Sequence, residues 1–163
     1  MIRPATVYDA PAIAAIYNPY IAATTISFEE APVSDREMAE RIAGVTANLP
    51  WYVFEADGKV VGYAYATPWR TRCAYRLSVE TSVYISSDYP RRGIGTQLYR
   101  TLLDDLRQRG ITVVIGGIAL PNAASVALHE RMGFEKVAHF KKVGRKFDRW
   151  IDVGYWEYLM NDD

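Results

Sequence analysis

Cysteine and histidine are scarce in this sequence, and their scarcity excludes several kinds of chemistry. Cys73 is the only cysteine among 163 residues, so no internal disulfide can form, which suits a reducing compartment. A catalytic thiol needs a nearby base, and neither His129 nor His139 is close to Cys73 in sequence. We therefore interpret Cys73 as a semi-buried structural residue, and we expect no bound metal.

Net charge and long apolar runs are also absent. The 19 Lys and Arg residues are balanced by 19 Asp and Glu residues, which argues against a general nucleic-acid-binding surface. No stretch approaches the roughly 20 apolar residues of a membrane-spanning helix, and the first residues hold no apolar run of the kind a signal peptide needs. We expect a cytoplasmic protein that binds neither nucleic acid nor membranes.

The chain does contain enough apolar material for one ordinary core. Hydrophobic residues make up 50% of the sequence and aromatic residues 13%, and aromatic side chains line pockets as readily as they fill cores. No internal repeat, low-complexity tract or linker-like change of composition divides the chain. Residues 1–163 are therefore expected to form a single domain.

The N-terminal part is expected to form a strand and two helices. A short strand is predicted at 2–3, followed by a helix that Asp9 caps and that runs to about residue 20. Ser34, with Glu37 three residues later as a capping box, begins a second helix that should end at Gly44.

Three strands should follow these helices. Asp57-Gly58 is a strong hairpin signal between strands predicted at 51–56 and 60–67. In the third strand, at 77–86, the residues alternate, so that Glu80 points to the face opposite its valine neighbours.

The C-terminal half alternates helices with strands. A helix over 93–109 has an apolar residue every four positions, and a β-branched strand follows at 112–118. A shorter helix is predicted over 122–132, and two final strands at 134–141 and 147–158. The strand–helix–strand unit implies a right-handed parallel crossover, whereas the hairpins imply antiparallel pairs. The fold class is therefore α/β of the α+β kind, with a mixed, mainly antiparallel sheet and helices on both faces.

A glycine-containing turn opens the predicted helix at residue 93. Residues 90–96, Pro-Arg-Arg-Gly-Ile-Gly-Thr, lie between a strand and a helix. A helix N-terminus offers unpaired N–H groups, and the glycines let a diphosphate approach the backbone. The Gly-Lys-Ser/Thr ending of a P-loop is missing, and Leu98 replaces the third glycine of a dinucleotide fingerprint. The alternative is a plain turn with solvated arginines.

A second polar group is expected on the helix at 122–132. Asn122, Ser125 and His129 are three and four residues apart, so they share one face beside the end of a parallel strand, which favours a ligand site. They could equally be a helix cap, an exposed hydroxyl and a surface histidine. Glu80 is either the ion-pair partner of a nearby arginine or a general base whose pKa burial raises.

These residues resemble a known family. Arg91 to Gly95, followed by Leu98, look like the coenzyme A pyrophosphate loop of the GNAT N-acetyltransferases, and Asn122, Ser125 and residues 130–134 look like their second signature. Pro90 departs from the pattern, because Gln or Arg usually stands there. Further segments resemble the phosphinothricin N-acetyltransferase group, which includes methionine sulfoximine and methionine sulfone acetyltransferases; they lie at 25–29, 63–65, 69–75, 79–85, 120–122 and 150–153.

The resemblance implies a GNAT-like fold in which a parallel strand splay holds acetyl-CoA as co-substrate. It implies direct transfer without an acyl-enzyme, with Glu80 as the base that deprotonates the amine. His129 would be the acid that protonates the departing thiolate, unless a neutral imidazole only donates a hydrogen bond there. The residues expected to bind acetyl-CoA are Val83, Tyr84, Ile85, Arg91, Arg92, Gly93, Ile94, Gly95, Thr96, Asn122 and Ser125.

The substrate implied by the resemblance is a small amine that carries a carboxylate. Arg70 and Arg72 suit that carboxylate, because guanidinium pairs with it bidentately. A homodimer is expected, since family members often form one with sites near the interface. The residues expected to wall the substrate pocket are Phe28, Glu29, Tyr65, Trp69 and Tyr75.

Three other interpretations remain open. The chain could acetylate another amine, such as a peptide N-terminus, a polyamine or an antibiotic. It could be an acyl-CoA-binding sensor without turnover. A nucleotide-dependent oxidoreductase is disfavoured by the missing third glycine. Glu80 and the pair Arg70 and Arg72 favour catalysis on a small anionic amine.

Overall fold

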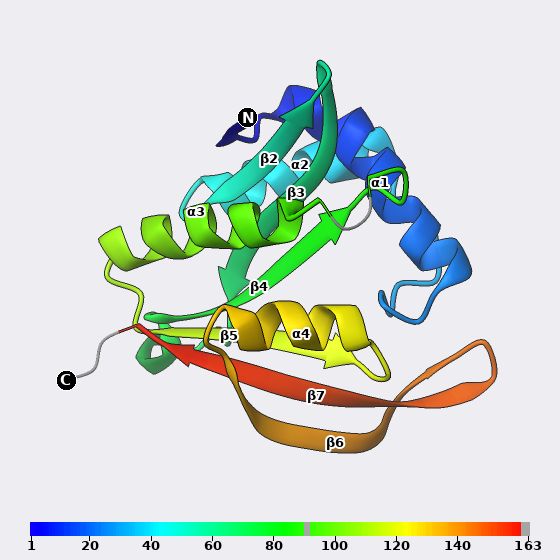
Figure 1. The fold of residues 1–163 in the computed structure, drawn as a ribbon, viewed down its shortest axis with the longest axis vertical. Helices are drawn as coiled ribbons and strands as arrows, with labels where there is room; N and C mark the ends of the chain where they lie inside the picture. The colour runs from blue at the N-terminus through cyan, green and yellow to red at the C-terminus, as the bar shows by residue number, and fades with distance from the viewer. Residues whose placement is uncertain (90–91, 161–163) are drawn as a thin grey trace.

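The computed structural model describes residues 1–89 and 92–160, and a seven-stranded sheet forms its centre (Figure 1). The strands follow the order β1-β2-β3-β4-β5-β7-β6, and every neighbouring pair is antiparallel except β4 and β5. The predicted mixed, mainly antiparallel sheet is therefore confirmed. The strands are β1 (Ile2–Pro4), β2 (Trp51–Ala56), β3 (Lys59–Pro68), β4 (Ser78–Ile85), β5 (Val113–Ala119), β6 (Glu135–Lys146) and β7 (Arg149–Leu159).

Helices cover both faces of this sheet. Figure 1 shows α1 (Ala10–Ala23) and α2 (Asp35–Thr46) behind the sheet, and α3 (Ile94–Gln108) and α4 (Ala123–Arg131) in front of it. Short 3-10 helices occur at 7–9 and 73–75. In the part of the chain that the structure describes, no helix combines the length and the apolar character that crossing a membrane requires.

Each face of the sheet has its own apolar core. The core under α3 contains Leu98, Leu102 and Leu106, which recur at the predicted spacing of four and are all 0% exposed. The opposite core joins Ile13 of α1 and Ile42 of α2, which are also 0% exposed. Burial of whole apolar side chains on both sides fixes the sheet between two helical layers.

The parallel strands β4 and β5 pair only over their first residues. Ser78, Val79 and Glu80 lie opposite Val113, Val114 and Ile115, and no later pair of the two strands is recorded in the described residues. Both strands nevertheless continue, because β4 stays paired with β3 and β5 with β7. The two strands therefore separate beyond Glu80, and the parallel splay expected from the resemblance is present.

Three predictions of the sequence analysis for the first half of the chain are wrong. Helix α2 does not end at Gly44 but continues to Thr46, since a helix interior tolerates glycine at a modest cost. The Asp9 side chain does not cap α1; its carboxylate pairs with Arg3 at 2.8 and 2.9 Å and accepts the Thr6 N–H at 2.8 Å. The thiol of Cys73 is exposed rather than semi-buried.

The hairpin of β6 and β7 is longer than predicted. Strand β6 runs to Lys146 because a bulge between Phe140 and Gly144 lets pairing resume, and the Asp152 carboxylate supports the bulge by accepting the Lys142 N–H at 2.8 Å. Phe147, predicted to begin the last strand, instead forms the turn with the next residue, both at positive φ. This is the backbone of a tight two-residue hairpin.

Candidate active site

A groove opens at the N-terminus of α3. Gly93 caps the helix at φ 70°, and the first intrahelical bond runs from the Gln97 N–H to the Gly93 carbonyl at 3.1 Å. The N–H groups of Ile94, Gly95 and Thr96 belong to the first turn of this helix, where amides have no acceptor within the helix, and they lie at the positive end of the helix dipole. The groove has a volume of about 800 Å³ and also contains Ile85, Arg92 and residues of α4.

The groove fits a bulky anion. Its glycines leave the backbone open: a Cβ on Gly95 would lie 3.2 Å from a methyl group of Leu128, and a Cβ on Gly93 would occupy open space. The Arg92 guanidinium lies 5.3 Å from the ring centre of Tyr89, which keeps a positive charge at the groove. Arg91, expected to bind acetyl-CoA, and Pro90 lie outside the described residues. Backbone amides and a guanidinium are the donors that a diphosphate needs, and the glycines let it approach them.

A narrow passage lies between the separated strands, next to the groove: its residues Tyr84 and Asn122 directly adjoin Ile85 and Ala123 of the groove in sequence. Its volume is about 50 Å³, and Val83 and Tyr84 of β4 line it together with Asn122 and Ser125. The Asn122 side chain caps α4 by accepting the Ser125 N–H at 3.2 Å, so the predicted helix cap exists and lies at the passage as well. The Ile85 carbonyl accepts a hydrogen bond from the Tyr20 hydroxyl at the groove end.

The passage opens on the other face of the sheet into a cavity of about 450 Å³. The cavity and the passage share five lining residues, so they are continuous. Alternation along β4 places Glu80, Ser82 and Tyr84 on this face, while Thr81 faces α3. The cavity is lined by Tyr17, Ile26, Ser27, Phe28, Glu29, Glu80, Ser82, Tyr84, Gly117, Ala119, Val153 and Tyr155.

Glu80 lies where this cavity meets the opening between the strands. One carboxylate oxygen would be 3.2 Å from a Cβ on Gly117, so the missing side chain of that glycine leaves room for it. Burial raises the pKa of Glu80, and the positive charge of Arg70 partly opposes this rise. A carboxylate with a raised pKa in a cavity can accept a proton near neutral pH.

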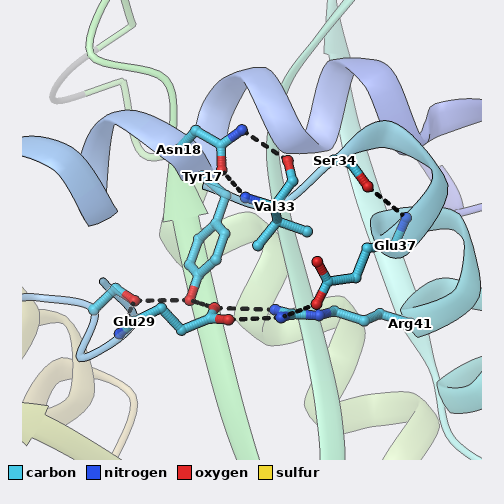
Figure 2. Close-up of polar contacts among 8 residues, drawn as sticks. Tyr17, Asn18, Glu29, Val33, Ser34, Glu37 and Arg41 are labelled. Carbon is cyan, nitrogen blue, oxygen red and sulfur yellow. Dashed lines mark hydrogen bonds and ion pairs between the residues drawn. The ribbon is translucent and has the colours of Figure 1, made fainter. Parts of the chain in front are cut away.

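Glu29 lines the same cavity, but its pKa is shifted in the opposite direction by the polar contacts that Figure 2 shows. The guanidinium of Arg41 donates to both Glu29 oxygens, at 2.6 and 3.0 Å, and the Tyr17 hydroxyl donates to one of them. These bonds, above all those from Arg41, lower the pKa of Glu29. Arg41 also binds Glu37 at 3.0 Å, so the Glu37 side chain does not close the predicted capping box, although Ser34 still accepts the Glu37 N–H. The cavity thus contains two different carboxylates: Glu29 stays ionised, whereas Glu80 is protonated more readily.

His129 is buried on the opposite side of the passage. Its Nδ1 donates to the Ser125 carbonyl at 2.7 Å, so in the neutral ring Nε2 accepts from the Tyr99 hydroxyl at 2.8 Å. The Tyr99 oxygen is in turn 3.0 Å from the Thr81 hydroxyl. Burial lowers the pKa of His129, which favours the neutral imidazole.

Sequence reasoning missed Tyr99 and Thr81 as partners of His129. Tyr99 follows Leu98 on the apolar side of α3 and is 0% exposed, so its pattern is that of a core residue. Thr81 fits the alternation of a strand and gives no polar signal of its own. Tyr17 and Arg41 were missed as well, because their contacts with Glu29 join segments twelve residues apart across a loop.

The expected substrate residues do not all meet at the cavity. Phe28 and Glu29 line it, and Arg70 is close enough to act electrostatically on Glu80 and Tyr155. Arg72 lines a separate pocket of about 620 Å³ that Arg70 also borders, and Tyr75 is 42% exposed outside the cavity. Trp69 packs edge-on against the cavity residue Tyr155 at 5.5 Å, and Tyr65 stacks on Trp51 at 4.1 Å; neither Trp69 nor Tyr65 lines the cavity itself.

Several known acetyltransferases have similar sequences. The family model described as "Acetyltransferase (GNAT) domain" matches residues 2–154. A phosphinothricin N-acetyltransferase of Alcaligenes faecalis is 45% identical over 155 residues, which cover 94% of this chain and 79% of that one. An L-methionine sulfoximine/L-methionine sulfone acetyltransferase of Pseudomonas paraeruginosa is 39% identical over 165 residues, covering 98% and 94%.

Solved structures agree with these relatives. The crystal structure of a GNAT superfamily phosphinothricin acetyltransferase from Sinorhizobium meliloti, in complex with acetyl-CoA, superposes with a TM-score of 0.95. That protein is 34% identical to this chain, and the match covers 99% of this chain and 89% of that one. The fold, the glycine turn at α3 and the sequence match all point to the same family. The chain belongs to the GNAT acetyltransferases.

Proposed function

We propose that the protein transfers the acetyl group of acetyl-CoA to the amino group of a small amino-acid-like substrate, of the phosphinothricin, methionine sulfoximine or methionine sulfone type. The position of Glu80 carries this proposal. Its carboxylate lies at the junction between the passage and the cavity, where an amine on one face of the sheet would meet a thioester that enters from the other. The names of the relatives support the choice of substrate.

Bound acetyl-CoA would supply the acetyl group as a thioester, and the chain's own residues would bind and orient the reactants. The amides of Ile94, Gly95 and Thr96, with Arg91 and Arg92, would hold the diphosphate. Val83, Tyr84 and Ile85 of β4 and Asn122 and Ser125 of α4 would line the arm that leads to the passage. Two bound reactants in fixed positions supply much of the rate of such a transfer.

On the amine side, Glu80 would accept the ammonium proton and free the nitrogen lone pair for attack. Arg70, whose charge acts on Glu80 and Tyr155, would bind the substrate carboxylate, and Phe28 and Glu29 would contact the rest of the molecule. Cys73 lines the arginine-bordered pocket and not the cavity, which supports direct transfer without an acyl-enzyme.

His129 would supply the proton that the departing sulfur needs. In the imidazolium form both ring nitrogens donate, Nδ1 to the Ser125 carbonyl and Nε2 to the Tyr99 oxygen, and the Tyr99 hydroxyl can then donate into the passage. The lowered pKa makes this form a strong acid that is scarce at neutral pH. A neutral ring would instead only accept from Tyr99 and hold its hydroxyl in place.

The proposed reaction is tested by incubating the protein with acetyl-CoA and a panel of amines while free thiol is followed. We expect thiol release with phosphinothricin, methionine sulfoximine or methionine sulfone, and little with their methyl esters, which lack the carboxylate that Arg70 would bind. Faster turnover of a peptide N-terminus, a polyamine or an aminoglycoside would move the substrate class. Acetyl-CoA binding without thiol release across the whole panel would instead indicate a sensor.

Glu80→Gln is expected to lower kcat by about a hundredfold or more while the dissociation constant of acetyl-CoA stays unchanged, because the amide cannot accept the proton. The ionised form of Glu80 is the base, so kcat/KM of the parent should fall as the pH falls through the raised pKa, and the variant should lack this fall. Glu40→Gln, at an exposed position on α2, is the matched control. Equal activity of parent and Glu80→Gln would remove Glu80 from the mechanism.

His129→Phe and Tyr99→Phe test the proton donor on the other side of the passage. If the proton passes from His129 through Tyr99, both variants should lower kcat by a similar factor, on the order of a hundredfold. Steady-state rates at saturating amine and acetyl-CoA measure this effect. A normal rate in Tyr99→Phe with a slow His129→Phe would restrict the role to the imidazole, and normal rates in both would leave the sulfur to be protonated by solvent.

We also propose that the protein is a cytoplasmic homodimer. The edge hairpin exposes Val137, Phe140, Val143 and Trp150 by 53 to 61%, which is unusual for a free surface and suits an apolar contact. The exposed thiol of Cys73 suits a reducing compartment. Sedimentation velocity should give twice the mass of the 18.4 kDa chain; the mass of a single chain at assay concentration would contradict the dimer.

A further inference from the structure

Lys146, the last residue of β6, is a buried cation that the proposed reaction does not use. Its residue exposure is 4%, whereas its neighbours Arg145 and Phe147 are exposed. The ammonium donates to three backbone carbonyls, those of Ile21 at 2.8 Å, Thr24 at 2.8 Å and Ser27 at 2.7 Å. A buried charge is stable only when its hydrogen bonds are made, and these three bonds satisfy the ammonium completely.

The three carbonyls belong to the end of α1 and to the loop that follows it. Ile21 lies in the last turn of α1, where the carbonyls receive no hydrogen bond from a later N–H of the helix. The negative end of the helix dipole lies there and favours a cation. Thr24 and Ser27 lie in the loop. One ammonium therefore closes the helix and fixes the first part of the loop, and its three hydrogens are arranged as a tripod that a planar guanidinium does not reproduce.

A second contact joins the same hairpin to the same loop. Gly144 is buried, and a Cβ there would lie 2.4 Å from two ring carbons of Phe28. Phe28 thus packs directly on the backbone of β6. Gly144 and Lys146 are two residues apart, so they face the loop from the same side of the strand.

The loop held in this way forms a wall of the cavity next to Glu80. Four consecutive residues from Ile26 to Glu29 line the cavity, whereas none of them lines the groove at the N-terminus of α3. The hairpin therefore acts on the side of the site that would receive the amine, and not on the diphosphate side.

We propose that Lys146 is a positioning residue for the amine substrate: its three bonds to carbonyls hold residues 24–29 as the wall of the cavity, and Gly144 sets the position of Phe28 in that wall. This inference rests on the proposed acetylation of a small amine, because it assigns the cavity to that substrate. Lys146 does not touch the reacting atoms. Its effect is on where the loop presents Phe28 and Glu29.

The first test compares Michaelis constants in Lys146→Met, Lys146→Arg and the control Lys141→Met, whose side chain is exposed on the same strand. In both Lys146 variants we expect the KM for the amine to rise about tenfold, with kcat and the KM for acetyl-CoA unchanged, because uniform binding of one substrate is lost. The control should match the parent. An unchanged amine KM in folded Lys146→Met, or full rescue by arginine, would overturn the proposal.

The second test follows hydrogen exchange of the backbone amides and needs no turnover. In Lys146→Met, exchange should accelerate in residues 24–29 and stay unchanged in β4 and β5; acceleration everywhere would mean a general loss of stability and would overturn the proposal. If the parent acetylates no amine on the panel, the proposed function fails, while this exchange pattern still judges the role of Lys146. Should Lys146→Met not fold, Gly144→Ala decides by the same KM comparison, since the added methyl group displaces Phe28; an unchanged amine KM would then count against the proposal.

Discussion

The separation of β4 from β5 beyond Glu80 and Ile115 is the constraint on which the site depends. Inside a sheet, neighbouring strands form hydrogen bonds with each other's backbone groups. Two strands that separate therefore leave N–H and carbonyl groups available on their facing edges. Here the separation also opens a passage through the sheet, which is continuous with the cavity on one face and adjoins the groove on the other. Without it the helix N-terminus at Gly93 and the carboxylate of Glu80 would belong to unconnected surfaces.

The alternation of side chains along β4 then distributes the chemistry between the two faces. Glu80 and Tyr84 face the cavity, and Thr81 faces α3, where it contacts the buried Tyr99 and His129. The two carboxylates of the cavity differ for physical reasons: Glu29 is held ionised by Arg41, while burial raises the pKa of Glu80. Two carboxylates in one cavity can therefore have separate duties, one as a fixed charge and one as a proton acceptor.

Sequence reasoning predicted the order of strands and helices and the nature of the sheet, because those features are local. The spacing of Leu98, Leu102 and Leu106, the Asp57-Gly58 turn and the glycine turn at α3 each lie within a few residues. Boundaries failed where a distant contact decided them, as at the β6 bulge that the Asp152 carboxylate supports. The site was predictable in part. Glu80 and Phe28 lie at the cavity as expected, but no local pattern in the sequence distinguishes Arg70 from Arg72, which lines the neighbouring pocket.

The two halves of the site differ in how much of the chain is needed to build them. Apart from Tyr20, the groove is lined by residues of 85–89, 92–96 and 123–131, which belong to the end of β4, the segment that follows it, the start of α3, and α4. The wall beside Glu80 depends on Lys146, whose bonding partners lie 119 to 125 residues earlier in the sequence. Contacts of such separation cost more loop-closure entropy than local contacts do. The cavity next to Glu80 is thus completed by the hairpin of β6 and β7. Changes in that hairpin can alter the cavity while the backbone amides at the N-terminus of α3 keep their positions.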